Sequence, residues 1–210
     1  MKKIIIIGSG GHAQVVIDII QEMGGFEIYG ITSNSLTKGD FFCGYPVLGN
    51  DSVLNDLNSK DYLVAIGIGG FTNNLLRKKI YLNIKELGYD FINVIHPSAI
   101  ISKTAKLGEA VVIFAGVIVN PGSYIGNNSI LATGCSVDHN TIINDHVLIS
   151  AGAVIGASIE IEEGSLIALG GKIVSGIKIG KECLIAAGAV VVNDLPEKSK
   201  VFGIPAKTKE

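Results

Sequence analysis

Aliphatic side chains recur at every sixth position through the second half of the chain. The residue two places before each of them is mostly small. A period of six is typical of hexapeptide β-helices, in which six residues form one short strand and one corner of a triangular prism. Three hexads make one coil, and each coil pairs its backbone with the next. Sixteen positions without a gap predict a parallel β-helix of a little over five coils: Ile101, Leu107, Ile113, Val119, Ile125, Leu131, Val137, Ile143, Ile149, Ile155, Ile161, Ile167, Ile173, Ile179, Ile185 and Val191.

The first 95 residues follow a different pattern, in which strand and helix signals alternate. Residues 4–7 are four consecutive isoleucines, as in a strand buried on both faces, and a glycine turn follows them. Apolar residues then recur at helical spacing as far as Met23, where two glycines end the helix. The alternation predicts a small, mostly parallel α/β sheet. Its further elements are expected to be strands at 28–31, 62–66 and 92–95, and a helix at 75–87 with Arg77, Lys78, Lys79 and Lys85 facing solvent.

These changes of pattern divide the chain into three parts. We expect an α/β domain at residues 1–95, a β-helix at 96–192 and a C-terminal cap or tail at 193–210. The hexad period stops after Val191, and the sequence Asn-Asp-Leu-Pro at 193–196 turns the chain away. Residues 201–205 are expected to fold back on the last coil, because the open end of a β-helix exposes unpaired strand edges.

Low charge restricts the partners of the chain. Only 17% of residues are charged and the net charge is −2, which gives no electrostatic basis for binding nucleic acid or an anionic membrane. Cys43, Cys135 and Cys183 show no metal-binding spacing, so we expect no metal site and three buried or half-buried thiols in a reducing compartment. The apolar run at 4–7 is too short for a signal peptide or a membrane span. A cytoplasmic protein is therefore expected.

Among the four histidines, His139 is the strongest candidate for catalysis. It lies two places after an inward-facing aliphatic residue, a phase that puts it outside the prism at a corner, where copies of the chain can meet. Neutral imidazole is suited to take a proton from a hydroxyl or amine that attacks a thioester. Asp138 and Asn140 flank it, and one coil further on the N–H of Ala157 or Gly156 is a candidate oxyanion donor. A surface histidine in a solenoid turn is the alternative.

The other histidines rank lower as candidates. His146 is expected to be a solvated turn residue on another face of the prism. His96 precedes a proline at the domain junction and is expected to be structural. His12 follows the glycine turn at the start of a helix, where capping the helix and touching a ligand are equally good interpretations.

The glycine turn itself resembles a dinucleotide-binding loop. Gly8-Ser9-Gly10-Gly11-His12-Ala13 lies between a strand and a helix, and a helix N-terminus offers unpaired N–H groups to phosphate. The acidic residue that would bind an adenosine ribose after the second strand is missing, however, since Ser33 and Asn34 stand there. A nucleotide-sugar is therefore a better ligand than NAD, and a glycine turn without a ligand is the alternative.

Several stretches together resemble one bacterial family. The segments IIIIGSGGHAQVVIDII, LVAIG, LLRKKI, NVIHPSAII, VDHN and VFGIPAK are similar, in this order, to the sialic-acid O-acetyltransferase and UDP-amino-sugar N-acetyltransferase family. The resemblance spans nearly the whole chain. It implies a Rossmann-like N-terminal domain followed by a left-handed parallel β-helix, assembled as a homotrimer with active sites between subunits.

The resemblance also assigns roles to residues. His139 matches the general base of the family, and Gly10, Gly11, His12 and Gly67 match its nucleotide-sugar pocket. No cofactor is implied as a permanent component; acetyl-CoA is a co-substrate. By position, its pantetheine arm is expected to run along the β-helix at Leu148, Ala157, Leu169 and Ala187.

The chain departs from the family pattern at three places. Asn140 stands where members often have an acidic residue after the base, and Leu148 stands where many have a second histidine. Ser33 and Asn34 replace an Asp-Asp pair that contacts the nucleotide in the family. The first two changes bear on the strength of the base, with Asp138 as a candidate substitute for the missing acid. The third bears on the identity of the nucleotide.

Three functions remain as hypotheses. The favoured one is acetyl-CoA-dependent N-acetylation of a nucleotide-linked amino-sugar, most simply a UDP-amino-sugar, in surface glycan biosynthesis. The second is O-acetylation of a sugar such as a sialic acid, in which the same His139 would serve. The third is a non-catalytic β-helix subunit that binds a nucleotide-sugar, which the missing acid beside His139 favours.

Overall fold

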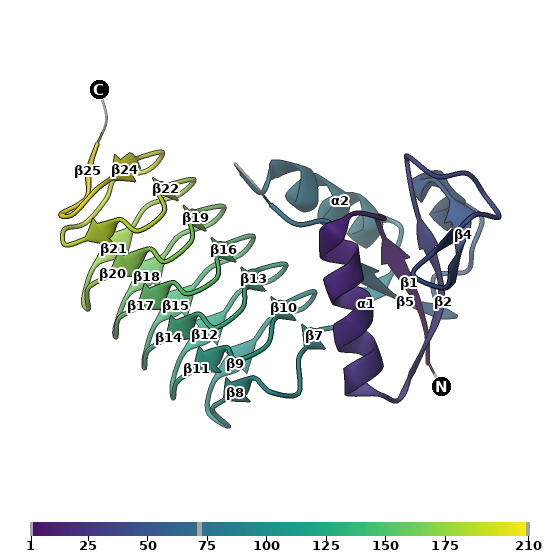
Figure 1. Ribbon diagram of the computed structural model, residues 1–210, viewed down its shortest axis with the longest axis horizontal. Coiled ribbons are helices and arrows are strands. Elements are labelled where there is room, and N and C mark those ends of the chain that lie inside the picture. The colour runs from purple at the N-terminus through teal and green to yellow at the C-terminus, as the bar shows by residue number, and fades with distance from the viewer. Residues whose placement is uncertain (1, 71–72, 209–210) are drawn as a thin grey trace.

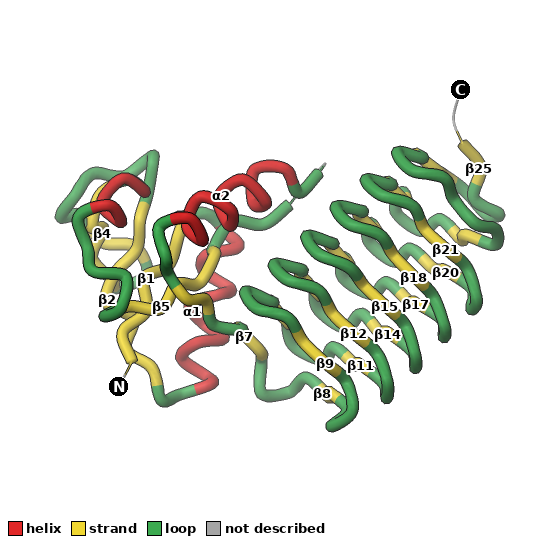
Figure 2. Tube along the Cα trace, turned by 180° about the vertical axis from the view of Figure 1, so that it is seen from behind, coloured by secondary structure: helices red, strands yellow, loops and turns green. Residues whose placement is uncertain are grey.

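Stacked coils of short parallel strands make up the larger part of the molecule (Figure 1). The structure is a computed structural model and describes residues 2–70 and 73–208. Paired residues in successive coils are 18 positions apart, for example Ser136 and Val154, as the hexad period predicts. The coils form a left-handed parallel β-helix with three sheets, whose strand columns are seen from behind in Figure 2.

One of the three sheets faces the N-terminal domain and is called the docked sheet. It continues into the C-terminal segment and contains β7 (Val94–Ile95), β10 (Val112–Ile113), β13 (Ile130–Leu131), β16 (Leu148–Ile149), β19 (Leu166–Ile167), β22 (Leu184–Ile185), β24 (Lys200–Phe202) and β25 (Lys207–Thr208).

The other two sheets are named by chain order. The second sheet contains β8 (Ile100–Ile101), β11 (Ile118–Val119), β14 (Ser136–Val137), β17 (Val154–Ile155), β20 (Lys172–Ile173) and β23 (Val190–Val191). The third sheet contains β9 (Lys106–Leu107), β12 (Tyr124–Ile125), β15 (Ile142–Ile143), β18 (Glu160–Ile161) and β21 (Lys178–Ile179).

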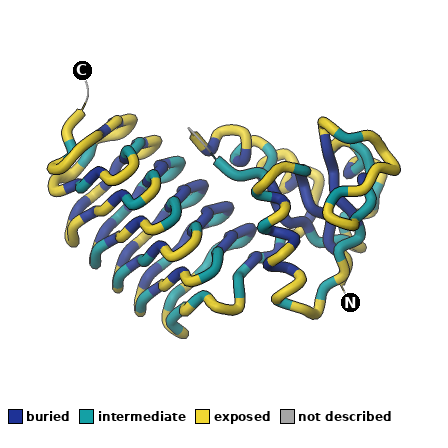
Figure 3. Tube along the Cα trace, in the orientation of Figure 1, coloured by how far each residue is buried: buried dark blue, intermediate teal, exposed yellow. Residues whose placement is uncertain are grey.

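The predicted inward residues form the core of the prism. From Ile113 to Val191 every member of the hexad series is buried, and only Ile101 and Leu107 in the first coil are half-buried. Buried and exposed residues alternate along each coil (Figure 3). Each inward side chain packs on its counterparts in the neighbouring coils, so stability accumulates from coil to coil.

The N-terminal domain is a small α/β sheet with the strand order β3-β4-β2-β1-β5-β6. The central strand β1 is buried on both faces, as its isoleucines predict. All neighbours in the sheet run parallel except β3 and β4. The elements are β1 (Lys2–Ile7), α1 (Gly11–Met23), β2 (Phe26–Thr32), β3 (Phe41–Phe42), β4 (Tyr45–Gly49), the 3-10 helix η1 (Asp51–Asn55), β5 (Tyr62–Ile66), α2 (Leu75–Glu86) and β6 (Asp90–Phe91).

One expected strand is wrong as a single element. Residues 92–95 divide between the two parts of the molecule: β6 ends at Phe91 in the N-terminal sheet, and β7 starts at Val94 as the first strand of the docked sheet. The apolar run is continuous because Ile92 packs under α1 while Val94 pairs with the first coil. The chain therefore passes between the domains without a linker.

The two helices dock the N-terminal domain on the prism. The apolar side of α1 packs against the outward side chains of the docked sheet, including Ile130, Leu148 and Leu166. Helix α2 lies along one prism edge, made by residues 109–110, 127–128, 145–146 and 163–164 and called the α2 edge below. At the C-terminal end of the prism, β24 pairs with β22 and β25 pairs with β24.

Candidate functional site

His139 lies on an exposed prism edge between the second and third sheets. Its side chain faces solvent beside a shallow hollow of about 420 Å³ that Pro121 and Gly122 also line. The Asn140 amide nitrogen is 3.1 Å from the imidazole Nδ1. The Asp138 carboxylate accepts the main-chain N–H of His139 at 2.7 Å. Asp138 thus holds the backbone of the turn, whereas Asn140 is the side chain that contacts the ring.

The two expected oxyanion donors are already bonded. The Ala157 N–H donates to the hydroxyl of Ser175 at 3.0 Å, and the Gly156 N–H donates to the carbonyl of Ile173 at 3.0 Å. The Gly156 bond belongs to the ladder between coils and holds the prism together. Only the Ala157 N–H, whose partner is a side chain, can be released by a simple rotation.

The residues expected to hold acetyl-CoA fall into three places. Ala157 lies one coil beyond His139 on the same edge. Leu169 and Ala187 are exposed on the edge between the docked and second sheets. They lie on successive coils, where the Gly188 N–H donates to the Leu169 carbonyl at 2.8 Å. Leu148 is 7% exposed and lies beneath the N-terminal domain. Within one chain the second sheet separates the edge of His139 from the edge of Leu169.

The glycine turn and loop 67–70 meet over the docked sheet. Gly10 and Gly11 are exposed, with no neighbouring atom within 4 Å of where a Cβ would stand. A Cβ at Gly67 would lie 2.8 Å from Ala13 Cβ, so only glycine fits where the loop crosses α1. Ser33 is buried and lies 2.6 Å from the hydroxyl of Ser9, while Asn34 is exposed at the end of β2. The predicted nucleotide-sugar residues thus share one end of the N-terminal sheet.

His12 connects this end of the sheet to the β-helix. Its ring stacks on Phe114 of the first coil at 5.5 Å, and its Nε2 is buried without a hydrogen-bond partner among the described residues. Burial, with Arg77 nearby, lowers the imidazole pKa to about 3. His12 is therefore neutral at physiological pH and presents one unsatisfied nitrogen beside loop 67–70.

Several expectations about exposure are wrong. His146 is 5% exposed rather than solvated, and burial lowers its pKa. Arg77 is 1% exposed rather than on the wet side of α2. Both lie where α2 covers the prism. The hexad pattern and the helical pattern each describe one domain, so neither predicts this contact between domains. Cys43 is exposed, while Cys135 and Cys183 are buried as expected. His96 accepts the N–H of Ser98 in a turn, which is a structural role as expected.

A further cavity lies elsewhere, between the start of α2 and the prism. It holds about 830 Å³ and is lined by Leu166, Leu184 and Lys200 of the docked sheet and by Lys181 and Lys198. Sequence reasoning missed it because it forms only where the two domains meet. Within residues 2–70 and 73–208 there is no group of three metal-ligating side chains and no helix long and apolar enough to cross a bilayer.

Comparisons with known proteins agree with this architecture. Residues 3–84 match the PglD N-terminal domain family. A GDP-perosamine N-acetyltransferase from Caulobacter crescentus, solved as a histidine-to-alanine variant with CoA and GDP-perosamine, is 31% identical; the match covers 99% of this chain and 97% of that one, with a TM-score of 0.91. This chain belongs to the hexapeptide-repeat sugar acetyltransferase family.

Two further relatives support this assignment. The acetyltransferase domain of PglB from Neisseria gonorrhoeae, solved with acetyl coenzyme A, is 31% identical over 99% of both chains, with a TM-score of 0.76. UDP-N-acetylbacillosamine N-acetyltransferase from Bacillus subtilis is 31% identical over 121 residues. That alignment covers 55% of this chain and 52% of the Bacillus enzyme, about half of each.

Proposed function

We propose that this chain is an acetyl-CoA-dependent N-acetyltransferase acting on a nucleotide-linked amino-sugar. The observation that carries the proposal is whole-chain similarity to a GDP-perosamine N-acetyltransferase and to a PglB acetyltransferase domain solved with acetyl coenzyme A. The glycine turn, His12 and loop 67–70 would receive the nucleotide-sugar, which is a UDP- or GDP-amino-sugar by analogy with the relatives. This substrate class favours a cytoplasmic enzyme whose product is used to build a surface glycan.

The reaction is direct transfer with His139 as the base. The sugar amine attacks the thioester carbonyl, a C–N bond forms, and His139 Nε2 takes a proton from the attacking nitrogen. The C–S bond then breaks, and the proton passes from the imidazolium to the CoA thiolate. Histidine is also the residue replaced, by alanine or asparagine, in two of the Caulobacter structures.

The working unit in this proposal is a homotrimer. Four of the six outward positions of the second sheet are aliphatic, and three of these are exposed: Ile100 by 66%, Ile118 by 39% and Val154 by 45%. Ser136 and Lys172 occupy the two polar positions. This sheet lies between the edge of His139 and the edge of Leu169 and Ala187. Packing of copies through it would bring His139 of one copy to the acetyl-CoA edge of the next, which a single chain keeps apart.

The test is release of the CoA thiol with a panel of acceptors. We expect turnover with a UDP-, dTDP- or GDP-linked amino-sugar. Turnover with sialic acid alone would instead make the protein an O-acetyltransferase, and tight nucleotide-sugar binding without thiol release from any acceptor would make it a binding subunit.

Replacement of His139 tests the base. His139→Ala is expected to lower kcat by at least about 100-fold, because a positioned general base contributes this much to proton transfer. The melting temperature should not change, since the side chain is exposed. His96→Ala, a histidine in a turn outside the proposed site, is the matched control and should retain its rate. A near-normal rate for His139→Ala would remove it as the base.

A further inference from the structure

Arg77 is a buried cation held by main-chain carbonyls. It is 1% exposed and forms no salt bridge within the described part of the chain. Its Nη1 donates to the carbonyls of Ile66 at 2.9 Å and Ile68 at 2.6 Å. Its Nη2 donates to Ala110 at 3.2 Å, and its Nε to Asn128 at 3.3 Å. One guanidinium therefore joins three segments that are far apart in sequence.

These carbonyls belong to both domains. Ile66 ends β5, and Ile68 lies in loop 67–70, whereas Ala110 and Asn128 lie on two successive coils of the α2 edge. Burial lowers the pKa of Arg77 to about 9, so it stays charged at neutral pH. A buried charge is costly unless its donors are satisfied, and the four carbonyls offset that cost.

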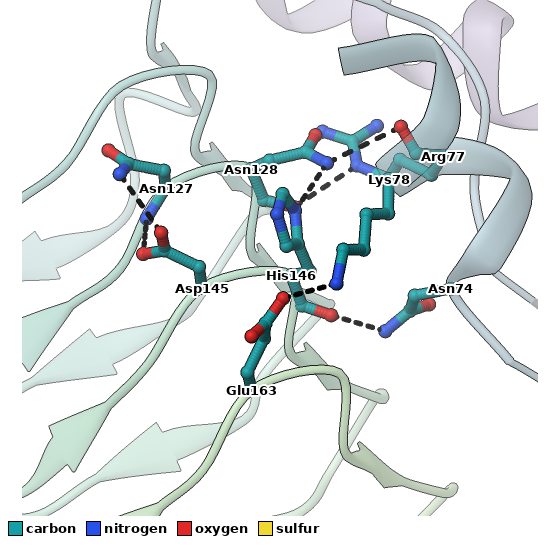
Figure 4. Close-up of polar contacts among 8 residues, drawn as sticks. All are labelled: Asn74, Arg77, Lys78, Asn127, Asn128, Asp145, His146 and Glu163. Carbon is teal, nitrogen blue, oxygen red and sulfur yellow. Dashed lines mark hydrogen bonds and ion pairs between the residues drawn. The ribbon is translucent and has the colours of Figure 1, made fainter. Parts of the chain in front are cut away.

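The contacts beside Arg77 form a continuous polar column. Asn128 donates to the Arg77 carbonyl and lies 2.9 Å from His146 Nδ1, and Asn74 donates to the His146 carbonyl at 2.8 Å (Figure 4). Lys78 pairs with Glu163 one coil further along. These side chains fasten α2 to the prism edge. Among the described side chains of α2, Arg77 is the one that donates to the carbonyls of residues 66 and 68.

Loop 67–70 is the bridge between the glycine turn and the docked sheet. A Cβ at Gly69 would stand 3.3 Å from the His12 ring, and one at Gly70 would stand 3.2 Å from Leu148 Cδ2. On the other side, the Ile68 side chain fills the space beside Gly8. The position of this loop therefore sets the position of His12 relative to Leu148.

We propose that Arg77 is a positioning residue for the nucleotide-sugar. It fixes loop 67–70 against two coils of the β-helix. The distance between the proposed nucleotide-sugar pocket and the docked sheet is thereby fixed as well. This role rests on the proposed function. A structural role limited to holding the two domains together would be shared by every α2 contact with the prism, including the bond from Tyr81 to Glu109.

Kinetics of Arg77→Lys separate the two roles. Lysine keeps the charge but lacks the fork that spans carbonyls in three directions. We expect KM for the nucleotide amino-sugar to rise about tenfold, with kcat and the KM for acetyl-CoA changed by less than about threefold. Tyr81→Phe is the matched control: it removes a bond between α2 and the prism but none to the loop, and its KM should stay near that of the wild type. Equal KM increases in the two variants, or a loss of kcat alone in Arg77→Lys, would overturn the proposal.

Amide exchange gives a readout that does not depend on turnover. The Gly67 N–H donates to Ile7 at 2.8 Å and the Val112 N–H donates to Ser129 at 3.0 Å. In Arg77→Lys the Gly67 amide should exchange at least tenfold faster while the Val112 amide is unchanged; unchanged exchange at Gly67 would contradict the clamp. Arg77→Gln, which also removes the guanidinium, is a second variant for which the same result is expected.

Two outcomes remain to be distinguished. If neither variant folds, native-state exchange of the wild type decides, because a clamp requires Gly67 to open with the same denaturant dependence as Val112; opening of Gly67 alone at lower denaturant overturns the proposal. If the wild type acetylates no amino-sugar, the proposed function fails, and the exchange experiment still tests whether Arg77 holds the loop.

Discussion

At the residue scale, Asn140 is the side chain that would set the tautomer of His139 in the proposed mechanism. With its amide nitrogen facing the ring, Nδ1 accepts and the ring proton sits on Nε2. Rotating the amide by half a turn presents Oδ1, places the proton on Nδ1 and frees Nε2 as a base. An aspartate accepts only, so it would hold the productive tautomer and stabilise the imidazolium. Asn140→Asp is therefore expected to raise kcat by about three- to tenfold, measured by thiol release at saturating substrates.

The backbone at Asn140 allows a matched control. Its φ is 56°, a conformation that asparagine, aspartate and glycine all adopt readily. Asn140→Gly keeps the turn and removes the side chain, so it should lower kcat, while all three forms should melt at similar temperatures. If Asn140→Asp were no faster than Asn140→Gly, the side chain at this position would have no part in orienting the imidazole.

The hexad phase predicted some residue environments and not others. It placed His139 outside the prism, and the structure exposes it there. The same phase put His146 outside the prism, correctly as to direction, yet α2 covers that edge and buries the ring against Tyr81. Arg77 was misjudged for the same reason. Burial between domains depends on how they dock, and neither repeat carries that information.

At the element scale, two glycines of the proposed pocket have different surroundings: Gly67 is tightly packed and Gly10 is open. Gly67 has no room for a Cβ, since Ala13 Cβ and the Ile7 carbonyl would lie at 2.8 and 2.9 Å. Gly67→Ala is expected to destabilise the protein by about 1–3 kcal/mol through overpacking. Gly10 has open space around it and is the N-cap of α1, so Gly10→Ala should lower stability by less than about 1 kcal/mol and weaken nucleotide-sugar binding by about tenfold. Thermal melting and calorimetric titration measure the two effects.

The comparison between these variants separates packing from ligand contact. Normal binding by a stable Gly10→Ala variant would show that the ligand does not approach the glycine turn. Unchanged stability of Gly67→Ala would show that the crossing of loop 67–70 and α1 is looser than its contacts imply.

Which elements the sequence predicted follows from how each is stabilised. Strand β5 and the coils carry their own periodic pattern, and both were placed correctly. The sequence pattern does not predict the hairpin of β3 and β4 or the short helix η1, because β3 has only two residues outside any repeat and one turn of helix is too short to show a period. Some of their hydrogen bonds are local, such as that from the Ser52 N–H to Asn50 Oδ1, whereas Asp51 accepts from Thr32 and the Leu54 carbonyl accepts from Tyr89. Residues 92–95 were assigned as one strand because buried runs look alike whichever sheet they join.

At the scale of the whole molecule, a single chain carries the parts of the proposed site on different faces. The glycine turn, His12 and Leu148 lie over the docked sheet, Leu169 and Ala187 lie on one border of the second sheet, and His139 lies on the other border. Sequence patterns predicted which residues point outward but not their separation across the prism. In the proposed assembly, association through the second sheet, where Ile100, Ile118 and Val154 are exposed, would reunite them.

Ile118→Glu tests this assembly. Ile118 points outward from β11, the second strand of the second sheet, so a charge there should leave the prism folded but be costly to bury between copies. We expect sedimentation to show a trimer for the wild type and a monomer for the variant, with kcat lowered at least about 100-fold because each site takes His139 from a neighbour. Leu82→Glu is the control, since Leu82 is exposed on α2, over the prism edge opposite the second sheet; it should remain trimeric and active. A monomeric Ile118→Glu with full activity would mean that one chain completes the site alone.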